Sequence, residues 1–292
     1  MNQKYQYKTA TYYTITYLIT ATLWLIGAYI GKKGNGNGED FIFMLFGLLA
    51  PFIVSTVMTF SSKNKPMKKE FFNRLINIKL IQPKMLPVMF LIMPFAVLVS
   101  IAISTLFGGS MTQFQFADGF SFTLGSVPTL VLLLLAATFE ELGWRGYAFD
   151  SLHSRSTFFK ASILFGILWS AWHLPLVFVH DSYQYEIVQQ NIWYGVNFFV
   201  GIIPMGIIIS WMCVKNNKSI LAAMLFHFIV NMSQELLSMT QATKCIETAV
   251  LFVIAAALIA YEKELFFSKK HIVANAQHSE TEITPKAASV QI

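Results

Sequence analysis

Two carboxylates and a guanidinium stand at the end of an apolar run, in the stretch Phe139–Gly146 that follows Val131–Ala137. Each such charge costs roughly 2.5 to 3.5 kcal/mol at the centre of a membrane helix. Ionisable groups in such places are expected to be paired and functional. The chain must therefore fold so that Glu140, Glu141 and Arg145 find partners inside a membrane.

The composition agrees with a membrane protein. Of the 292 residues, 55% are hydrophobic and only 12% are charged, and the mean hydropathy is +0.56. One soluble core would not need so much apolar surface. The net charge of +6 is typical of basic loops that contact anionic lipid headgroups, so we expect the lipid bilayer as a partner and no nucleic acid. Cys213 and Cys245 are too few for a disulfide scaffold and are expected to be free thiols.

Segments of about 20 apolar residues, the length that crosses a bilayer as a helix, recur along the chain. We predict an all-α polytopic membrane protein with about eight transmembrane helices in a single domain, residues 1–270, followed by a disordered cytoplasmic tail, residues 271–292. The predicted helices are Thr9–Ile30, Phe41–Phe60, Leu86–Phe107, Val127–Phe149, Thr157–Val179, Asn191–Val214, Ile220–Met239 and Cys245–Glu262.

The basic residues are distributed unevenly between the two sides that these helices define. With the N-terminus inside, every Lys and Arg except Lys32, Lys33 and Lys244 falls in a cytoplasmic segment. This bias predicts an integral membrane protein with both termini in the cytoplasm. The loop Ser61–Met85 mixes its basic residues with Phe, Leu and Ile, which predicts either an amphipathic helix on the inner headgroups or a plain basic loop.

The spacing of the three buried charges divides them. Glu141 and Arg145 are four residues apart and share a helix face, so we predict that they pair and brace the site. Glu140 points about 100° away and lacks that partner, which favours a chemical role. The alternative is a buried ion network that only fixes the packing of helices.

Two later helices carry further polar side chains. Pro175, two residues after His173, is predicted to kink its helix toward the bundle interior. His227 and Asn231 are four residues apart on the seventh predicted helix, although such residues often serve only as hydrogen bonds between helices. Distances of 1.5 Å per residue along the helices put Glu140 and His227 in the inner half of the membrane but His173 too far out. We therefore expect the fifth helix to begin inside the cytoplasm.

A carboxylate, two imidazoles and a carboxamide that converge in a membrane cavity are suited to hydrolysis by an activated water. Glu140, helped by His173, can take a proton from water. His227 and Asn231 can then donate hydrogen bonds to an oxyanion. Glu140, His173 and His227 could instead bind zinc. The absence of an H-E-x-x-H motif favours a mechanism without a cofactor, but the residues leave both hypotheses open.

These motifs resemble those of a known family. Glu140-Glu141-x-x-x-Arg145, a histidine followed by Leu-Pro, and His227-x-x-x-Asn231 are similar in order and spacing to the motifs of the type II CAAX prenyl endopeptidases. These form the Ras-converting-enzyme branch of the CPBP intramembrane proteases, also called the Abi family. The similarity covers residues 127–239. Where the family usually has Phe four residues before the histidine, this chain has Trp169, which retains an aromatic ring.

The resemblance implies an eight-helix fold with a conical intramembrane cavity, open to the cytoplasm and to lipid. It implies removal of the last three residues of a prenylated Cys-a-a-X tail, with Glu140 and His173 activating water and with His227 and Asn231 stabilising the oxyanion. The partner would be a prenylated or otherwise membrane-associated peptide, and the absence of an organellar signal favours a prokaryotic cell membrane.

Three alternative functions remain. One is a zinc-dependent protease that acts on another membrane peptide, as in bacteriocin immunity. Another is a transporter, which would need an inverted repeat that the sequence lacks. The last is a scaffold that binds membrane proteins without cleaving them.

Overall fold

The structure is a computed structural model that describes residues 6–33, 39–119, 129–180 and 182–268. In these ranges every named element is helical, and an isolated antiparallel bridge joins Phe116 to Leu237. The predicted disordered tail, 271–292, lies outside the described residues. The elements are α1 (Thr9–Lys33), α2 (Glu39–Phe60), α3 (Lys65–Ile76), η1 (Ile78–Leu80), η2 (Pro83–Met85), α4 (Leu86–Leu106), η3 (Met111–Phe114), α5 (Thr129–Gly143), η4 (Trp144–Ala148), α6 (Phe149–His153), α7 (Phe158–Trp172), η5 (Leu174–Phe178), α8 (Tyr183–Gln190), α9 (Ile192–Lys215), α10 (Ile220–Leu236), α11 (Gln241–Tyr261) and α12 (Lys263–Phe267).

Six helices of the described chain are long and apolar enough to cross a membrane. They are α1, α2, α4 with η2, α7 with η5, α9 and α11. The chain is therefore a polytopic membrane protein, as its sequence predicts. The fourth and seventh predicted spans do not meet the same criterion, because α10 is shorter and α5 has only 15 residues and carries the buried charges.

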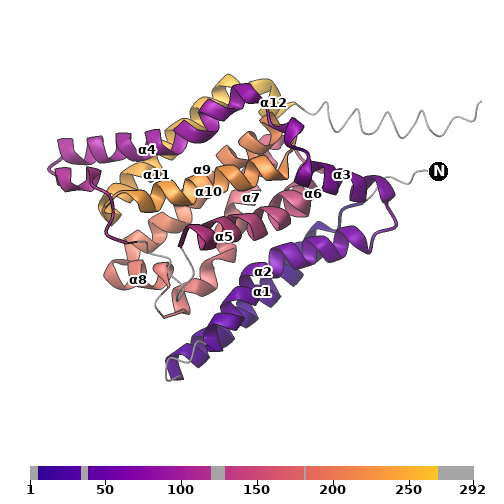
Figure 1. The fold of residues 1–292 in the computed structure, drawn as a ribbon, viewed down its shortest axis with the longest axis horizontal. Coiled ribbons are helices and arrows are strands. Elements are labelled where there is room, and N and C mark those ends of the chain that lie inside the picture. Colours follow the sequence, from indigo (N-terminus) through magenta and orange to yellow (C-terminus); the bar gives the residue numbers. More distant parts are fainter. Residues whose placement is uncertain (1–5, 34–38, 120–128, 181, 269–292) are drawn as a thin grey trace, which may run out of the picture.

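The helices α5, α7, α9 and α10 form the middle of the molecule, between the α1–α2 hairpin and the α4–α11 pair (Figure 1). Two glycines permit close crossings. A Cβ atom on Gly143 of α5 would lie 2.5 Å from the backbone of Pro51 in α2, and one on Gly166 of α7 would lie 2.9 Å from the backbone of Ile203 in α9. These contacts bring α2 and α9 directly against the helices that carry the polar motifs.

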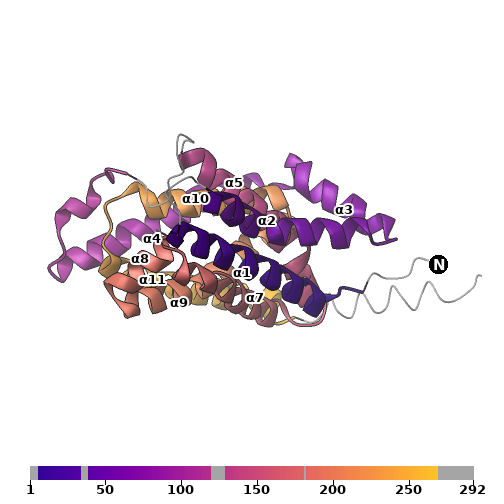
Figure 2. The same ribbon diagram turned by 90° about the horizontal axis from the view of Figure 1, so that it is seen from below.

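The segments rich in basic residues meet at one end of the molecule, where α3, α6, α12 and the start of α1 lie (Figure 1). Figure 2 shows α3 and the start of α1 at this same end. Arg155 Nη2 donates to the carbonyl of Tyr7 at 2.9 Å, and Lys215 pairs with Glu262 at 2.5 Å. This clustering agrees with the charge distribution along the sequence. That this end faces the cytoplasm stays a prediction.

Of the two alternatives for the segment between α2 and α4, the structure has a helix, α3. Asn64 caps its start by accepting a hydrogen bond from the backbone of Met67 at 2.9 Å. Phe72 and Ile76 are 50% and 70% exposed on its outer face. Arg74, in contrast, is buried. The expectation that the basic residues of this segment lie on the headgroups is therefore wrong for Arg74, because it turns inward to bind other elements.

The fourth predicted helix is not one regular helix. α5 ends at Gly143 and continues into η4, a π-helical turn, before α6 begins. In this turn the N–H of Phe149 bonds to the carbonyl of Trp144, five residues back instead of four. Such turns are rare and often occur at functional sites. This one follows directly after Glu140 and Glu141.

The fifth predicted helix ends earlier than its sequence suggests. α7 stops at Trp172, His173 is its C-terminal cap, and Pro175 lies in the 3₁₀-helix η5. Pro175 therefore follows the helix instead of kinking it, because proline lacks the N–H that an additional α-helical turn would require.

The mismatch in depth at His173 has a structural cause. The helical path of Glu140 continues through η4 and α6 to the turn that leads into α7. Measured from that turn, Glu140 lies about 20 Å along one arm and His173 about 22 Å along the other, at 1.5 Å per residue. In the α9–α10 turn Asn216 and Ser219 are buried while Asn217 between them is exposed. His227 follows the start of α10 by only two turns, and its contact with Glu141 at 3.0 Å places it beside Glu140.

Candidate active site

Glu140 lies in the last turn of α5 with only 6% of its surface exposed. Its Oε2 atom accepts hydrogen bonds from two indole Nε1–H groups, from Trp144 at 3.2 Å and from Trp169 of α7 at 2.8 Å. Within the described ranges, no hydrogen bond involves the other oxygen, Oε1. The carboxylate is thus held by one oxygen, and the other is available to a further partner.

Glu141 is fully buried and joins α5 to α10. Its Oε2 lies 2.9 Å from Nε of Arg145, and its Oε1 lies 3.0 Å from Nδ1 of His227. Arg145 also donates to Oγ of Ser210 in α9 at 3.2 Å and lies over the ring of Phe165, 4.2 Å from its centroid. The predicted Glu141–Arg145 pair is confirmed. Spacing within one helix could not reveal the contact with His227, which crosses between helices.

Both imidazole rings are oriented by their Nδ1 atoms. Nδ1 of His173 lies 2.8 Å from the carbonyl of Trp169. A carbonyl only accepts hydrogen bonds, so this Nδ1 carries the proton and the Nε2 of a neutral ring keeps its lone pair. Nδ1 of His227 faces a carboxylate in the same way. Trp169, which donates to Glu140, lies against both rings: its indole packs edge-on against His227, with 5.3 Å between ring centroids, and lies 6.0 Å from the His173 ring.

Asn231 lies one turn after His227 on α10 and is partly buried. Among the described residues, no hydrogen bond is made by its side chain. The structure therefore gathers Glu140, Trp169, His173 and His227 in one place and puts Asn231 on the adjoining turn.

Trp144 is a site residue that the sequence analysis does not single out. It follows Glu140 by four residues, the same spacing that predicts the Glu141–Arg145 pair. This spacing could have predicted that the indole N–H of Trp144 donates to Glu140. Its buried ring stacks on Tyr13 of α1, with 6.4 Å between centroids. The first helix, which carries no motif, therefore supports the site from behind.

Glu140, His173 and His227 are the residues that would bind zinc. Over the ranges that the structure describes, no three His, Cys, Asp or Glu side chains group closely enough to hold a metal ion. Oε2 of Glu140 accepts two indole hydrogen bonds, and Nδ1 of His227 faces the Glu141 carboxylate. A zinc site needs three converging ligands. The donor atoms in their observed arrangement do not fit one.

A cavity of about 200 Å³ lies next to Arg145, which is one of its lining residues. Its lining includes Arg74, Asp150, Ser210 and Cys213 but neither Glu140 nor the two imidazoles. It is therefore not the catalytic cavity that the resemblance implies. Cys213 and Cys245 are free thiols, as predicted.

Together, the fold and the site define a class. The protein is a polytopic membrane protein in which a buried carboxylate, oriented by two indoles, stands beside two oriented imidazoles. This combination is suited to acid–base hydrolysis of a substrate within the membrane.

Known proteins place the chain more narrowly. The family model "Type II CAAX prenyl endopeptidase Rce1-like" matches residues 122–233. A CAAX prenyl protease 2 from Methanococcus maripaludis is 59% identical over 269 residues, which cover 92% of this chain and 99% of that relative. The chain belongs to the Rce1-like family of type II CAAX prenyl endopeptidases. It is therefore a peptide hydrolase, and the transporter and scaffold hypotheses are not favoured.

Proposed function

We propose that this protein removes the last three residues of a prenylated Cys-a-a-X tail, by cleaving the peptide bond that follows the modified cysteine. The name of the archaeal relative supports this substrate. A prenyl group partitions into the bilayer, gaining about 0.8 kcal/mol per buried CH₂ group, and so brings the tail to an enzyme embedded there. The observation that carries the proposal is the Glu140 carboxylate, which two indoles hold by one oxygen.

In this mechanism Glu140 is the general base. Its Oε1 takes a proton from a water molecule while the water oxygen attacks the scissile carbonyl carbon. Because Nδ1 of His173 donates to the Trp169 carbonyl, its Nε2 has a free lone pair and accepts a hydrogen bond from the other O–H of that water. Glu140 then gives its proton to the leaving amine, the C–N bond breaks, and the tripeptide departs with a neutral N-terminus. The carboxylate is ready for another cycle.

His227 and Asn231 stabilise the oxyanion that forms on the scissile carbonyl. His227 donates from Nε2 when both of its ring nitrogens are protonated, and the Glu141 carboxylate at Nδ1 is the counter-ion that an imidazolium needs. The Asn231 amide adds a second donor from the next turn. Glu141 and Arg145 support the reaction by holding His227 in place. The two adjacent glutamates thus have different roles.

The sidedness of the protein belongs to the same proposal. The basic end, with α3, α6, α12 and the start of α1, faces the cytoplasm of a prokaryotic cell, with both termini there. Positive residues are enriched on that side of membrane proteins. A lipid-modified tail then enters laterally from the bilayer and ends near the basic cytoplasmic rim.

Replacement of Glu140 with Gln tests the base. The amide has nearly the same size and can still accept from the indoles, but it cannot take up a proton. The assay uses protein purified in detergent and measures, by mass spectrometry, the tripeptide released from a farnesylated peptide. We expect the rate of release to fall by about 10²- to 10⁴-fold.

The control is Glu186→Gln, which changes an exposed carboxylate on α8 and should keep wild-type activity. Equal release by the wild type and Glu140→Gln would show that Glu140 is not the base. A wild-type protein that releases no tripeptide would refute the substrate.

A further inference from the structure

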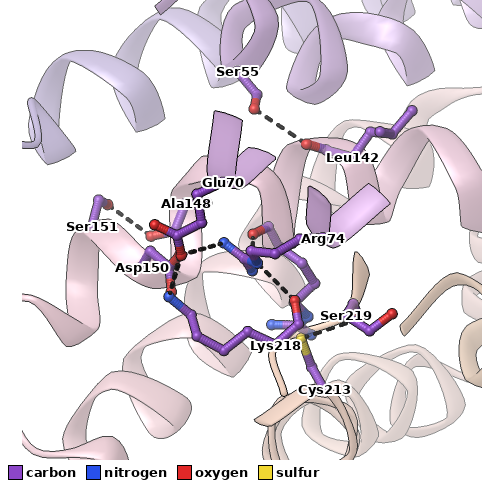
Figure 3. Close-up of polar contacts among 11 residues, drawn as sticks. Ser55, Glu70, Arg74, Leu142, Ala148, Asp150, Ser151, Cys213, Lys218 and Ser219 are labelled. Carbon is purple, nitrogen blue, oxygen red and sulfur yellow. Dashed lines mark hydrogen bonds and ion pairs between the residues drawn. The ribbon is translucent and has the colours of Figure 1, made fainter. Parts of the chain in front are cut away.

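Arg74 of α3 joins three segments that are far apart in the sequence (Figure 3). Its Nε donates to the carbonyl of Lys218 at 2.7 Å, its Nη1 to Oδ2 of Asp150 at 2.6 Å, and its Nη2 to the carbonyl of Arg145 at 2.8 Å. Its exposed fraction is 5%. A buried guanidinium with a directed hydrogen bond from each of its three nitrogens fixes both position and orientation.

The bond to the Arg145 carbonyl compensates for a break in helical hydrogen bonding. In an α-helix this carbonyl would accept from the N–H of Phe149, four residues on. In η4 that N–H bonds to Trp144 instead. Buried carbonyls need partners, and Nη2 of Arg74 supplies one. Arg74 thus stabilises the widened turn by donating to the Arg145 carbonyl, which has lost the Phe149 N–H as a partner.

Asp150 holds the other side of the widened turn. A π turn contains one residue more than an α-helical turn, so the residues after it are rotated by about 100° relative to a regular helix. Oδ2 of Asp150 binds both Arg74 at 2.6 Å and Lys218 at 2.9 Å. These ion pairs keep α6 in the rotated register.

A short path connects this cluster to the site. Arg145, whose carbonyl Arg74 binds, pairs through its side chain with Glu141, and Glu141 binds His227. Trp144, the first residue of the widened turn, donates to Glu140. A change in the geometry of η4 therefore reaches both glutamates through a single intervening residue.

Packing reinforces the attachment of α3. Phe71 is buried on the same face of α3, three residues before Arg74. A Cβ atom on Gly146 would lie 2.7 Å from the Phe71 ring, so the absence of a side chain in η4 makes room for it. α3 therefore rests directly on the widened turn.

We infer that Arg74 is a positioning residue for the hydrolytic reaction. By holding η4 in its π-helical form, it sets the orientation of Trp144 and Arg145 and hence of Glu140, Glu141 and His227. It touches no reacting atom. Through Arg74, the surface helix α3 helps to hold the residues of the active site in position. The kinetic part of this inference rests on the proposed function.

The test compares Arg74→Met, Arg74→Lys and a control, Lys69→Met, which removes an exposed cation from the same helix. Small displacements of catalytic groups can cost about 100-fold in rate. kcat is expressed per molecule of folded protein in the size-exclusion peak. We expect it to fall at least tenfold in Arg74→Met, with KM within twofold of wild type. Arg74→Lys should restore thermal stability but not kcat, because one ammonium group cannot make three directed bonds. Lys69→Met should match the wild type.

A spectroscopic measurement is independent of the substrate. In protein with ¹⁵N-labelled tryptophan, the indole signal of Trp144, assigned by its loss in Trp144→Phe, should shift in Arg74→Met and stay in place in Lys69→Met. An unmoved Trp144 signal would overturn the inference, as would wild-type kcat in Arg74→Met or full recovery of kcat in Arg74→Lys. If the wild type releases no tripeptide, the proposed function fails, and the indole shift still decides the role of Arg74.

Discussion

Glu140 and Glu141 are neighbours in the chain, yet their surroundings differ in kind. Glu141 meets a guanidinium and an imidazole, and removing one partner of such a buried pair typically costs about 3 to 5 kcal/mol. Glu140 meets two indole N–H groups, which are neutral donors. These orient the carboxylate without supplying a positive charge. A rotation of about 100° around one helix thus separates a carboxylate that holds structure from one that is available for proton transfer.

Trp169→Phe tests this arrangement. Phe keeps an aromatic ring beside His227 but removes the shorter of the two indole hydrogen bonds to Glu140. A hydrogen bond to a charged group contributes about 1.5 to 3 kcal/mol, and Trp144 remains as a donor. We expect kcat for tripeptide release to fall about tenfold, equivalent to about 1.4 kcal/mol, with little change in the melting temperature.

The control for this variant is Trp193→Phe, which alters a ring that is 70% exposed on α9. Its kcat should equal that of the wild type. A Trp169→Phe enzyme as fast as the wild type would show that the indole does not orient Glu140 for the reaction.

The succession of α5, η4 and α6 decides how the polar site connects to the basic end. An uninterrupted α-helix would turn Asp150 away from Arg74, since each residue rotates by about 100°. With the widened turn, Asp150 points between Arg74 and Lys218. Lys218 itself has a positive φ of 61°, in the left-handed region that non-glycine residues seldom adopt. The Arg74 bond to its carbonyl helps to hold that turn.

The Asp150 cluster predicts a pH dependence of stability. Burial by itself would raise the pKa of Asp150, but Lys218 and Arg74 outweigh this and hold the pKa well below its usual value of 3.8. Folding therefore favours the carboxylate. The stabilisation is complete above about pH 5 and is lost progressively as the pH falls below the unfolded-state pKa.

We expect the melting temperature in detergent to decrease between pH 5 and pH 3, as the unfolded state takes up a proton that the folded state resists. Asp150→Asn should be less stable than the wild type at pH 7 and should show a smaller decrease over this range. Parallel curves for the two proteins would mean that Asp150 does not contribute to the acid sensitivity.

Across the whole molecule, the helices without motifs form the supports of the site. Tyr12 and Tyr13 of α1 pack against Trp144, and α2 approaches α5 at Gly143. On the opposite side, α4 packs on α10 and α11. The polar residues are thereby enclosed by apolar helices, and electrostatic interactions are stronger in such low-dielectric surroundings. The segments rich in basic residues meet at one end of the molecule (Figure 1).

Labelling of single cysteines tests which end faces the cytoplasm. Two proteins are made in a Cys245→Ser background, in which Cys213 is buried. One carries Lys79→Cys near α3 and the other carries Glu186→Cys on α8. Both positions are exposed. In intact cells, a membrane-impermeant maleimide should label the cysteine at position 186 and spare the one at position 79. Both should react after the membrane is opened, and the opposite pattern would reverse the proposed orientation.

Much of this protein follows from local sequence alone. Apolar runs of membrane-spanning length predict its helices, and the four-residue spacing of Glu141 and Arg145 predicts their ion pair. Both are properties of a single helix, set by composition and by 3.6 residues per turn. The family motifs likewise name Glu140, His173, His227 and Asn231, whose catalytic roles stay predictions.

Contacts between helices were beyond the reach of such patterns. The bond from Glu141 to His227, the two indoles on Glu140 and the inward turn of Arg74 depend on the relative rotation and height of packed helices. One added residue in η4 and the α9–α10 turn, which Arg74 and Gln82 bind from elsewhere in the chain, set these quantities. Neither leaves a hydrophobic period in the sequence, because each is stabilised by partners from distant segments. Tertiary packing therefore made a basic residue of a surface helix part of the support for a buried carboxylate.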